Sequence, residues 1–325
     1  MRRHKNAKGI AVLLIILVLV IVFIYSGLRL LESTVFYADE TETAATKTIT
    51  RNGVDYFPRQ DIDVFLMMGI DRYGPVVSSG SYNNDGESDT VLLVVFDQKD
   101  ETTHVINLNR DTMVQMPVLG IGGRQAGTTY GQLALAHTYG SGLEDSCENT
   151  IRTVSDLLYG ITIDHYISMN MDAVATLNDA VGGVTVYVTD DFSGTDAQIP
   201  MGKTTLRGQQ AVDYVRLRMD VGDQLNLSRM ERQKDYIESF LQAFLAKLEE
   251  NSTFTLETYD AVSDYIVTDC SGTVLSSVIE RYADYTLAEP VSLKGENKLG
   301  ERYMEFYADE AALEELVLDL FFVEK

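Results

Sequence analysis

The sequence predicts an α/β fold: a single external domain with a central mixed β-sheet flanked by helices, after one N-terminal transmembrane helix. Three observations carry this prediction. β-rich stretches at Val64–Ile70, Thr90–Phe96 and Thr103–Asn109 follow one another closely. Beyond residue 149, helix and strand patterns alternate along the chain. A long apolar run without any charge lies near the N-terminus, at residues 10–28.

The N-terminal segment predicts a membrane anchor. Residues 1–9 form a basic tail, and residues 10–30 are long enough to cross a bilayer as a helix. Basic residues before the span and acidic residues after it predict a cytoplasmic N-terminus and an extracellular bulk, in a single-pass cell-membrane protein. A cleaved signal peptide is the alternative, although no clear small-x-small cleavage site follows the run. The polar stretch 31–58 is expected to be a tether.

The charge excludes one class of partner. The 325 residues hold 26 basic and 49 acidic side chains, a formal net charge of −23. Five of the basic residues and none of the acids lie in the first thirty, so the remainder carries −28. Nucleic-acid binders show a basic face, so no nucleic-acid partner is expected. Any anionic ligand must be held by a local cluster of arginine or lysine.

The external part divides into a main domain at 59–290 and a C-terminal strand and helix extension at 291–325. The clearest helix spans 228–251, where apolar residues recur on one face and Ser228 and Glu231 form a capping box. The other expected elements are helices at 149–159, 171–183, 207–218 and 310–322, and strands at 164–170, 184–188 and 302–308. Cys147 and Cys270 permit a disulfide in an oxidising compartment, and the sequence leaves their pairing open.

Charged residues gather where predicted strands end. The strand VINLN stops at Arg110–Asp111, a pair that on its own is more often a surface ion pair or turn than a functional site. Asp71 follows one strand and Asp89 precedes the next. Carboxylates at strand ends can hold Mg²⁺ or Mn²⁺ against phosphate oxygens, although single aspartates are also common turn residues.

Arginines also cluster at the start of the long helix. Arg229 and Arg232 lie in its first turns with Gln233, and Arg216 and Arg218 share one side of the preceding stretch if it is extended. Cations oppose the helix dipole at this end, so the cluster indicates either an anionic ligand or salt bridges to nearby acids. A diphosphate substrate would need such arginines together with a metal ion.

The motifs in order resemble one family. They are VFLMMGIDR, SDTVLLVVFDQKDETTHVINLNRDTMVQMP, LALAHTYGSG, TVSDLLYGITIDHYISMNMDAVATLNDAVGGVTVYV, LRGQQAVDYVRLR and LSRMERQ. The chain resembles the LytR–CpsA–Psr cell-envelope phosphotransferases from about residue 63 to 247, and more weakly to 287. This resemblance implies transfer of a glycopolymer, such as teichoic acid or capsule, from undecaprenyl diphosphate to a peptidoglycan muramic acid hydroxyl, with Mg²⁺ or Mn²⁺.

The resemblance also implies roles for residues. Asp89, with Asp71, would hold the metal, and Arg110 and Asp111 would be catalytic, with Asp111 a candidate base. The diphosphate would be bound by Arg72, Arg216, Arg218, Arg229, Arg232 and Gln233. An apolar tunnel would take the lipid, and its candidate lining residues, for which core packing is the alternative, are Met67, Met68, Phe240 and Phe244.

Three positions depart from the family pattern. Glu87 stands where the family often has arginine, Asn109 where proline is usual, and Ala134 where asparagine is usual, with His137 inside that motif. Two other functions stay open at this point. One is a polyprenyl-diphosphate hydrolase that uses water as the nucleophile, and the other is a non-catalytic envelope protein that binds polymer or regulates. The transferred polymer, the acceptor and the oligomeric state are not fixed by the sequence.

Overall fold

The computed structural model describes residues 48–324, except 218–220, 222–225, 252, 272–273, 275–276, 279–280, 283 and 302. The predicted anchor at 10–30 lies outside the described residues. Within the described part of the chain, no helix has the length and apolar character needed to cross a membrane.

A central mixed sheet organises the domain, as the sequence predicts. Its order is β11-β8-β3-β4-β5-β12, and β13 also pairs with β5. β3 runs parallel to β8, β5 runs parallel to β12 and β13, and the other pairs are antiparallel. The bounds of these strands are β3 Ile62–Ile70, β4 Ser88–Asp97, β5 Thr102–Leu108, β8 His165–Asn170, β11 Ile266–Thr268, β12 Thr286–Leu287 and β13 Val291–Ser292.

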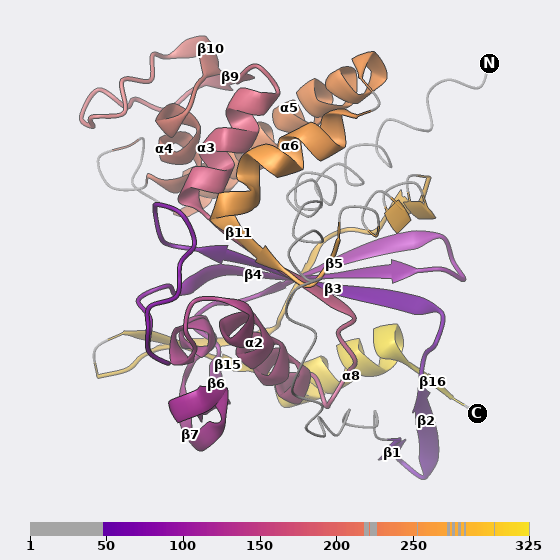
Figure 1. The fold of residues 1–325 in the computed structure, drawn as a ribbon. Coiled ribbons are helices and arrows are strands. Elements are labelled where there is room, and N and C mark those ends of the chain that lie inside the picture. Colours follow the sequence, from indigo (N-terminus) through magenta and orange to yellow (C-terminus); the bar gives the residue numbers. More distant parts are fainter. Residues whose placement is uncertain are drawn as a thin grey trace, which may run out of the picture.

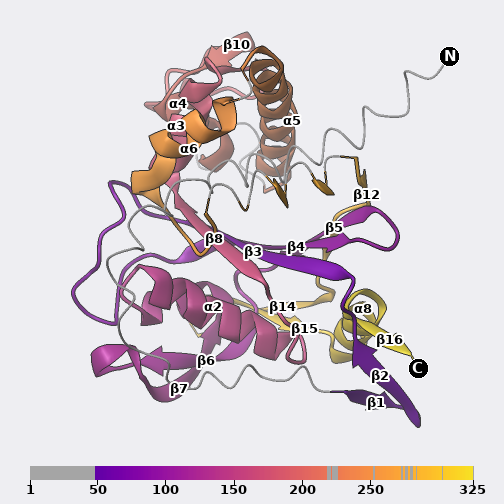
Figure 2. The same cartoon turned by 45° about the vertical axis from the view of Figure 1, so that its right-hand side comes forward.

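Helices cover both faces of this sheet (Figures 1 and 2). One face carries α3 Met171–Ala180, α4 Gln209–Arg216, α5 Asn226–Glu250 and α6 Phe254–Val262, with the small sheet of β9 Val184–Val188 and β10 Gly202–Leu206. The other face carries α2 Glu144–Leu157, α8 Glu310–Phe321, and the hairpin of β6 Met113–Leu119 and β7 Gln125–Gln132. Short 3-10 helices lie at Ile121–Gly123, Leu133–Tyr139 and Ser263–Tyr265.

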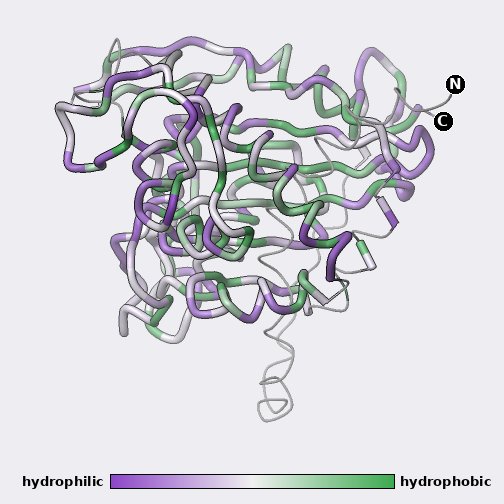
Figure 3. The backbone as a smooth tube through the Cα atoms, turned by 90° about the horizontal axis from the view of Figure 1, so that it is seen from above, coloured by the Kyte–Doolittle hydropathy of each residue, from purple (hydrophilic) through white to green (hydrophobic). Residues whose placement is uncertain are grey.

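The sheet separates two apolar cores because neighbouring strand residues point to opposite faces. Phe65 and Met67 pack under α3 to α6, whereas Leu66 and Met68 pack towards α2 and α8. In the view from above, the hydrophobic colour follows the strands in the interior, whereas the outer segments alternate between hydrophilic and hydrophobic stretches (Figure 3). Because both faces of β3 are buried, its sequence is a nearly continuous apolar run.

This separation decides two open questions from the sequence. Met68 lies in the core opposite to Met67, Phe240 and Phe244, so the four residues cannot line one tunnel. All four are buried core residues, which supports the packing alternative. Cys147 and Cys270 lie in different cores as well, and both are free cysteines.

The two ends of the described chain belong to the same unit. β2 Val54–Pro58 pairs with β1 Ile49–Arg51 and with the C-terminal strand β16 Phe322–Glu324. The expected tether at 31–58 is therefore wrong for Ile49–Pro58, because a strand far away in the sequence pairs with this segment. The C-terminal extension also contains the hairpin of β14 Gly295–Leu299 and β15 Met304–Ala308, and α8 contributes buried residues to the core.

Candidate active site

The predicted site residues Asp71, Asp89 and Arg110 meet at one edge of the central sheet. β3 and β4 are antiparallel, and so are β4 and β5, so the end of β3, the start of β4 and the end of β5 share that edge. Asp71 follows β3, Asp89 is the second residue of β4, and Arg110 comes two residues after β5. The topology thus brings together groups that are far apart in sequence.

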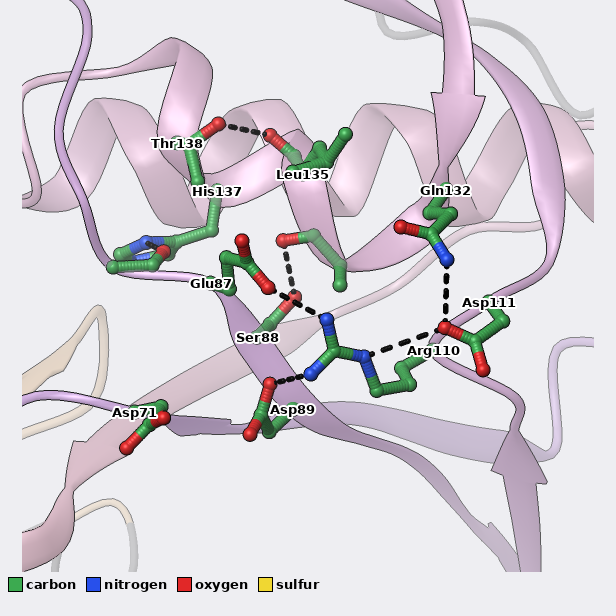
Figure 4. A network of polar contacts seen from close by, with 12 residues as sticks. Asp71, Glu87, Ser88, Asp89, Arg110, Asp111, Gln132, Leu135, His137 and Thr138 are labelled. Atoms are coloured by element: carbon green, nitrogen blue, oxygen red, sulfur yellow. Dashed lines mark hydrogen bonds and ion pairs between the residues drawn. The ribbon is translucent and has the colours of Figure 1, made fainter. Parts of the chain in front are cut away.

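Arg110 lies at the centre of this edge, among three carboxylates (Figure 4). Its guanidinium donates to Glu87 at 2.6 Å and to Asp89, and its Nε lies 3.6 Å from Asp111 Oδ1. Burial raises the pKa of Asp89, with Arg110 opposing and Asp71 and Glu87 adding to the increase. Burial likewise raises the pKa of Asp111, against the effect of Arg110. The cluster therefore carries an excess of negative charge around one cation.

Glu87 is an ion-pair partner of Arg110 at this edge. It stands where the resembling family often has arginine, and here its carboxylate forms the 2.6 Å ion pair with Arg110. Both side chains are partly exposed. A phosphate that approaches Arg110 must therefore compete with Glu87, or reach the guanidinium together with a cation that neutralises the carboxylate.

A second ion pair lies beside the first, between Asp71 and Arg216. Arg216 Nη2 donates to both oxygens of Asp71 at 2.8 and 3.0 Å, and its Nη1 reaches the Tyr73 hydroxyl at 3.4 Å. The Arg216 guanidinium also lies over the Tyr73 ring, 5.9 Å from the centroid. Arg216 is 44% exposed, so this cation is accessible to a ligand at the C-terminal end of α4.

The loop after β3 is fixed by the start of α3. Asn170 Nδ2 donates to Gly74 O at 2.7 Å, and Met171 N donates to Arg72 O at 3.0 Å. Arg72 is exposed, and its side chain has no ion-pair partner among the described residues. The Arg72 side chain passes close to Gly86, and its guanidinium is left without an ionic partner among the described residues.

Asp111 is held on its other side by Gln132, the last residue of β7. Gln132 Nε2 donates to Asp111 Oδ1 and to Met304 O, both at 2.8 Å. The side chain of Asn109 accepts from Asp111 N at 3.0 Å, which stabilises the turn after β5 in the position where the family usually has proline. Sequence reasoning missed Gln132, because nothing in the local pattern indicates that β7 returns to this edge.

The buried His137 holds the segment that leads into Glu87, through a hydrogen bond to Gly86. It is 2% exposed, and its Nδ1 lies 2.8 Å from Gly86 O, so Nδ1 carries the proton and donates it to this carbonyl. Burial lowers the pKa of His137 to about 4, and the ring is therefore neutral at neutral pH. Ala134, the other departure nearby, is buried and donates its backbone N–H to Arg110 O at 3.0 Å.

The side chain of Arg232 is engaged by protein partners. Arg232 is 4% exposed; its Nε donates to Tyr214 O at 2.9 Å, and its other nitrogens bond Leu217 O and Asp190. These contacts satisfy carbonyls at the end of α4, which explains a cation in the early part of α5 without a ligand. Arg218 lies outside the described residues, and so do the side chains of Arg229 and Gln233 in α5.

The donor set of Asp71 and Asp89 fits a hard cation. Both are partly exposed carboxylates at one edge, and Mg²⁺ typically takes one or two carboxylates together with substrate phosphates and water. Each carboxylate now pairs with an arginine, which a bound cation would have to displace. A different grouping, His165, Asp269 and Cys270, offers three ligand atoms within 4.8 Å of one another and lies at the opposite end of β8.

The fold and the site define an α/β protein with arginines and carboxylates at one sheet edge, an arrangement suited to binding and transferring phosphoryl groups. The model of the LytR_cpsA_psr family matches residues 30–319, and the chain belongs to this family.

Similar proteins agree with this assignment. A polyisoprenyl-teichoic acid–peptidoglycan teichoic acid transferase TagU of Enterococcus faecalis is 30% identical over 270 residues, which cover 82% of this chain and 80% of that protein. The crystal structure of protein gbs0355 from Streptococcus agalactiae has a TM-score of 0.62 and 25% identity, over 80% of this chain and 88% of that one. TagT bound to LIIa-WTA has a TM-score of 0.55 and 22% identity, over 80% and 90%, and shows the shared fold alone.

Proposed function

We propose that this chain is a phosphotransferase that moves an anionic glycopolymer, of the teichoic acid or capsule type, from undecaprenyl diphosphate to a muramic acid hydroxyl of peptidoglycan. Membership of the family and the printed name of the E. faecalis relative support the class of donor and acceptor. The single observation in the structure that carries the proposal is Arg110 held between Asp89 and Asp111 at an accessible sheet edge.

In this mechanism the acceptor hydroxyl attacks the phosphorus that carries the polymer. A new P–O bond forms to the acceptor, the P–O bond to the bridging oxygen breaks, and polyprenyl phosphate leaves. Asp111 takes the hydroxyl proton, and its raised pKa makes it a stronger base than an ordinary aspartate. Arg110 stabilises the negative charge on the transferring phosphoryl group.

The remaining site residues bind the donor. Arg216 and Arg72 are the exposed cations beside Asp71 and hold the second phosphate; Arg218, Arg229 and Gln233 are proposed to extend this site, as the resemblance implies. Arg232 takes part only if it leaves its carbonyl partners, so we give it a structural role first. Asp89 and Asp71 would hold Mg²⁺ or Mn²⁺, which supplies charge neutralisation at the diphosphate when bound.

The location of the enzyme is part of the proposal. Residues 10–30 would form a single-pass anchor with a cytoplasmic N-terminus, and the domain from residue 48 onward would lie outside the cell. A lipid-linked donor is confined to the bilayer, so an anchored domain meets it at high effective concentration.

The test is a transfer reaction with purified protein, polyprenyl-diphosphate-linked saccharide, Mg²⁺ and peptidoglycan fragments. Mass spectrometry would detect saccharide linked through a phosphodiester to the glycan. Arg110→Ala should lower the rate by about 100- to 1,000-fold, the usual cost of removing one transition-state stabiliser. Gln98→Ala, an exposed substitution beyond the far end of β4, is the matched control and should leave the rate unchanged. Equal rates in all three proteins would contradict the proposal.

A further inference from the structure

A tyrosine-rich surface adjoins the catalytic pair on the side of Asp111. We call it the β7–β15 shelf and define it by Tyr130, Gln132, Met304 and Tyr307. Gln132 joins its two strands at the site, since its Nε2 contacts both Asp111 and Met304 O. The backbone strengthens this junction, because Phe306 N donates to Asp111 O at 2.8 Å. Strand β15 of the C-terminal hairpin therefore contacts the candidate base, Asp111, directly through its backbone.

Tyr130 is the prominent side chain of the shelf. It precedes Gln132 by two residues on β7, so both side chains lie on the same face of the strand. Tyr130 is 60% exposed, and its hydroxyl has no hydrogen bond among the described residues. The 2.7 Å hydrogen bond to Glu305 raises the pKa of Tyr307, and Tyr130 lies close enough to add a smaller contribution. Tyr130 is therefore the accessible ring of the shelf, whereas the Tyr307 hydroxyl is bonded to Glu305 and its ring lies under Lys298.

The order of groups across the site gives this surface a direction. Figure 4 shows Asp71, Asp89, Arg110, Asp111 and Gln132 following one another across the sheet edge. The exposed cations Arg216 and Arg72 lie at the Asp71 end. In phosphoryl transfer the entering and leaving oxygens are in line on opposite sides of phosphorus. If polyprenyl phosphate leaves towards the arginines, the acceptor must enter from the Asp111 end, over the shelf.

The chemistry of the shelf limits what it can bind. Asp111 and Glu305 are both carboxylates, and Lys298 lies over the Tyr307 ring with its Nζ 4.9 Å from the centroid and pairs with Glu296. Among its described residues, the shelf therefore has no excess of positive charge that would hold a polyanion. Tyrosine presents a flat apolar face and a hydroxyl that both donates and accepts hydrogen bonds. Sugar rings offer the complementary groups, with apolar C–H faces and hydroxyls at the edge.

We propose that the β7–β15 shelf binds the acceptor, and that the occupant is the saccharide backbone of a peptidoglycan glycan strand, with Tyr130 stacking on a sugar ring next to the attacking hydroxyl. This inference rests on the proposed function, and it adds the location of the acceptor and the residues that select it. The C-terminal hairpin then contributes to acceptor specificity, although it lies outside the domain expected from the sequence.

The experiment compares Tyr130→Ala with Tyr187→Ala in the full chain in detergent. Tyr187 is 68% exposed on β9, in the layer on the other face of the sheet, and is the matched control. Transfer rates are measured as a function of the concentration of a peptide-free glycan fragment, at a fixed concentration of the lipid-linked donor. Tyr130→Ala should raise the acceptor KM about tenfold, because one aromatic contact is usually worth about that factor in affinity. The affinity for the donor should be unchanged. Tyr187→Ala should change neither quantity.

A binding measurement without turnover separates the two hypotheses. Saturation-transfer NMR with the same glycan fragment should give a signal with the wild type and Tyr187→Ala, and a much weaker one with Tyr130→Ala. Equal signals, or an unchanged acceptor KM, would overturn the shelf while the transferase proposal stands. Glycan binding through Tyr130 without any linked product would contradict the proposed function and keep the shelf. If Tyr130→Ala loses binding to phospholipid vesicles but keeps binding to the glycan fragment, the shelf is a membrane contact and the proposal is overturned.

Discussion

Protonation of His137 should destabilise the protein in mild acid. The buried ring is neutral, with a pKa lowered by burial to about 4, whereas a histidine in an unfolded chain titrates near 6.5. As the pH falls, the unfolded chain takes up this proton first. The stability that the neutral ring maintains is therefore fully present above pH 6.5 and is lost as the pH falls through about 4. At about 1.4 kcal/mol per pH unit, the loss is about 3 kcal/mol.

The assay is urea-induced unfolding at pH 7 and pH 4.5, followed by near-UV circular dichroism. His137→Gln is the informative variant, because an amide can still donate to Gly86 O but cannot be protonated in this range. The wild type should lose about 2 to 3 kcal/mol more than the variant between the two pH values. The carboxylates titrate in both proteins, so their contribution to the loss of stability cancels in the comparison.

A direct measurement guards against a variant that fails to fold. The chain has four histidines, so proton NMR can follow each ring through a titration, and His137 is the resonance that disappears in the variant. A His137 pKa close to 6.5, or equal losses of stability in the two proteins, would refute the reasoning.

Three further predictions concern the site and the fold. Gln132→Ala removes a hydrogen bond to the Asp111 carboxylate, worth about 1.5–3 kcal/mol, so transfer should slow by roughly 10- to 100-fold, and a rate within twofold of wild type would contradict the positioning role. The acid limb of the transfer rate should lie above the ordinary aspartate pKa of about 3.9, since burial raises the pKa of Asp111; activity falls as the pH drops through it, and a pH–rate profile with a limb at or below 3.9 would count against Asp111 as the base. Arg59 holds the buried Asp97 with two 2.7 Å contacts, so Arg59→Met should lower the free energy of unfolding by about 3–5 kcal/mol at pH 7, measured by urea titration, and a loss under 1 kcal/mol would show that Asp97 finds another partner.

The meeting of Arg110–Asp111 with Asp89 at one sheet edge could be predicted because its signal is local. The apolar strand of β5 stops at Arg110–Asp111, and the start of β4 carries Asp89, so both strand ends are visible in the sequence. The antiparallel pairing of β4 with β5 then brings them to one edge. Helix α5 was also predictable from its apolar stripe, and begins at Asn226, two residues before the expected capping box.

The missed features depend on pairings between distant segments. Nothing near Gln132 indicates a contact with Asp111, because that contact needs the whole β6–β7 hairpin to fold back. Residues 54–58, expected in the tether, form strand β2, which pairs with the nearby β1 and with β16, more than 260 positions later in the sequence. Arg232 shows the same limit: its position near a helix start indicates either a ligand anion or a salt bridge to an acid, and only the fold shows that Asp190 and the carbonyls of Tyr214 and Leu217 are its partners.

Glu87 illustrates how a departure from a family pattern can be read only in three dimensions. By sequence it removes an expected cation and indicates weaker phosphate binding. In the structure it is a direct partner of Arg110, so it also sets how strongly the free enzyme holds that guanidinium. This side chain is therefore expected to affect donor binding more than the fold.

The most direct test of the central claim is the stoichiometry of a single turnover. The protein is mixed in excess over a polyprenyl-diphosphate-linked saccharide, with Mg²⁺ and peptidoglycan fragments, and both products are quantified by mass spectrometry. Transfer predicts one glycan-linked phosphodiester for each polyprenyl phosphate released. Release of polyprenyl phosphate together with free saccharide phosphate, and no linked product, would contradict the transferase and establish hydrolysis instead.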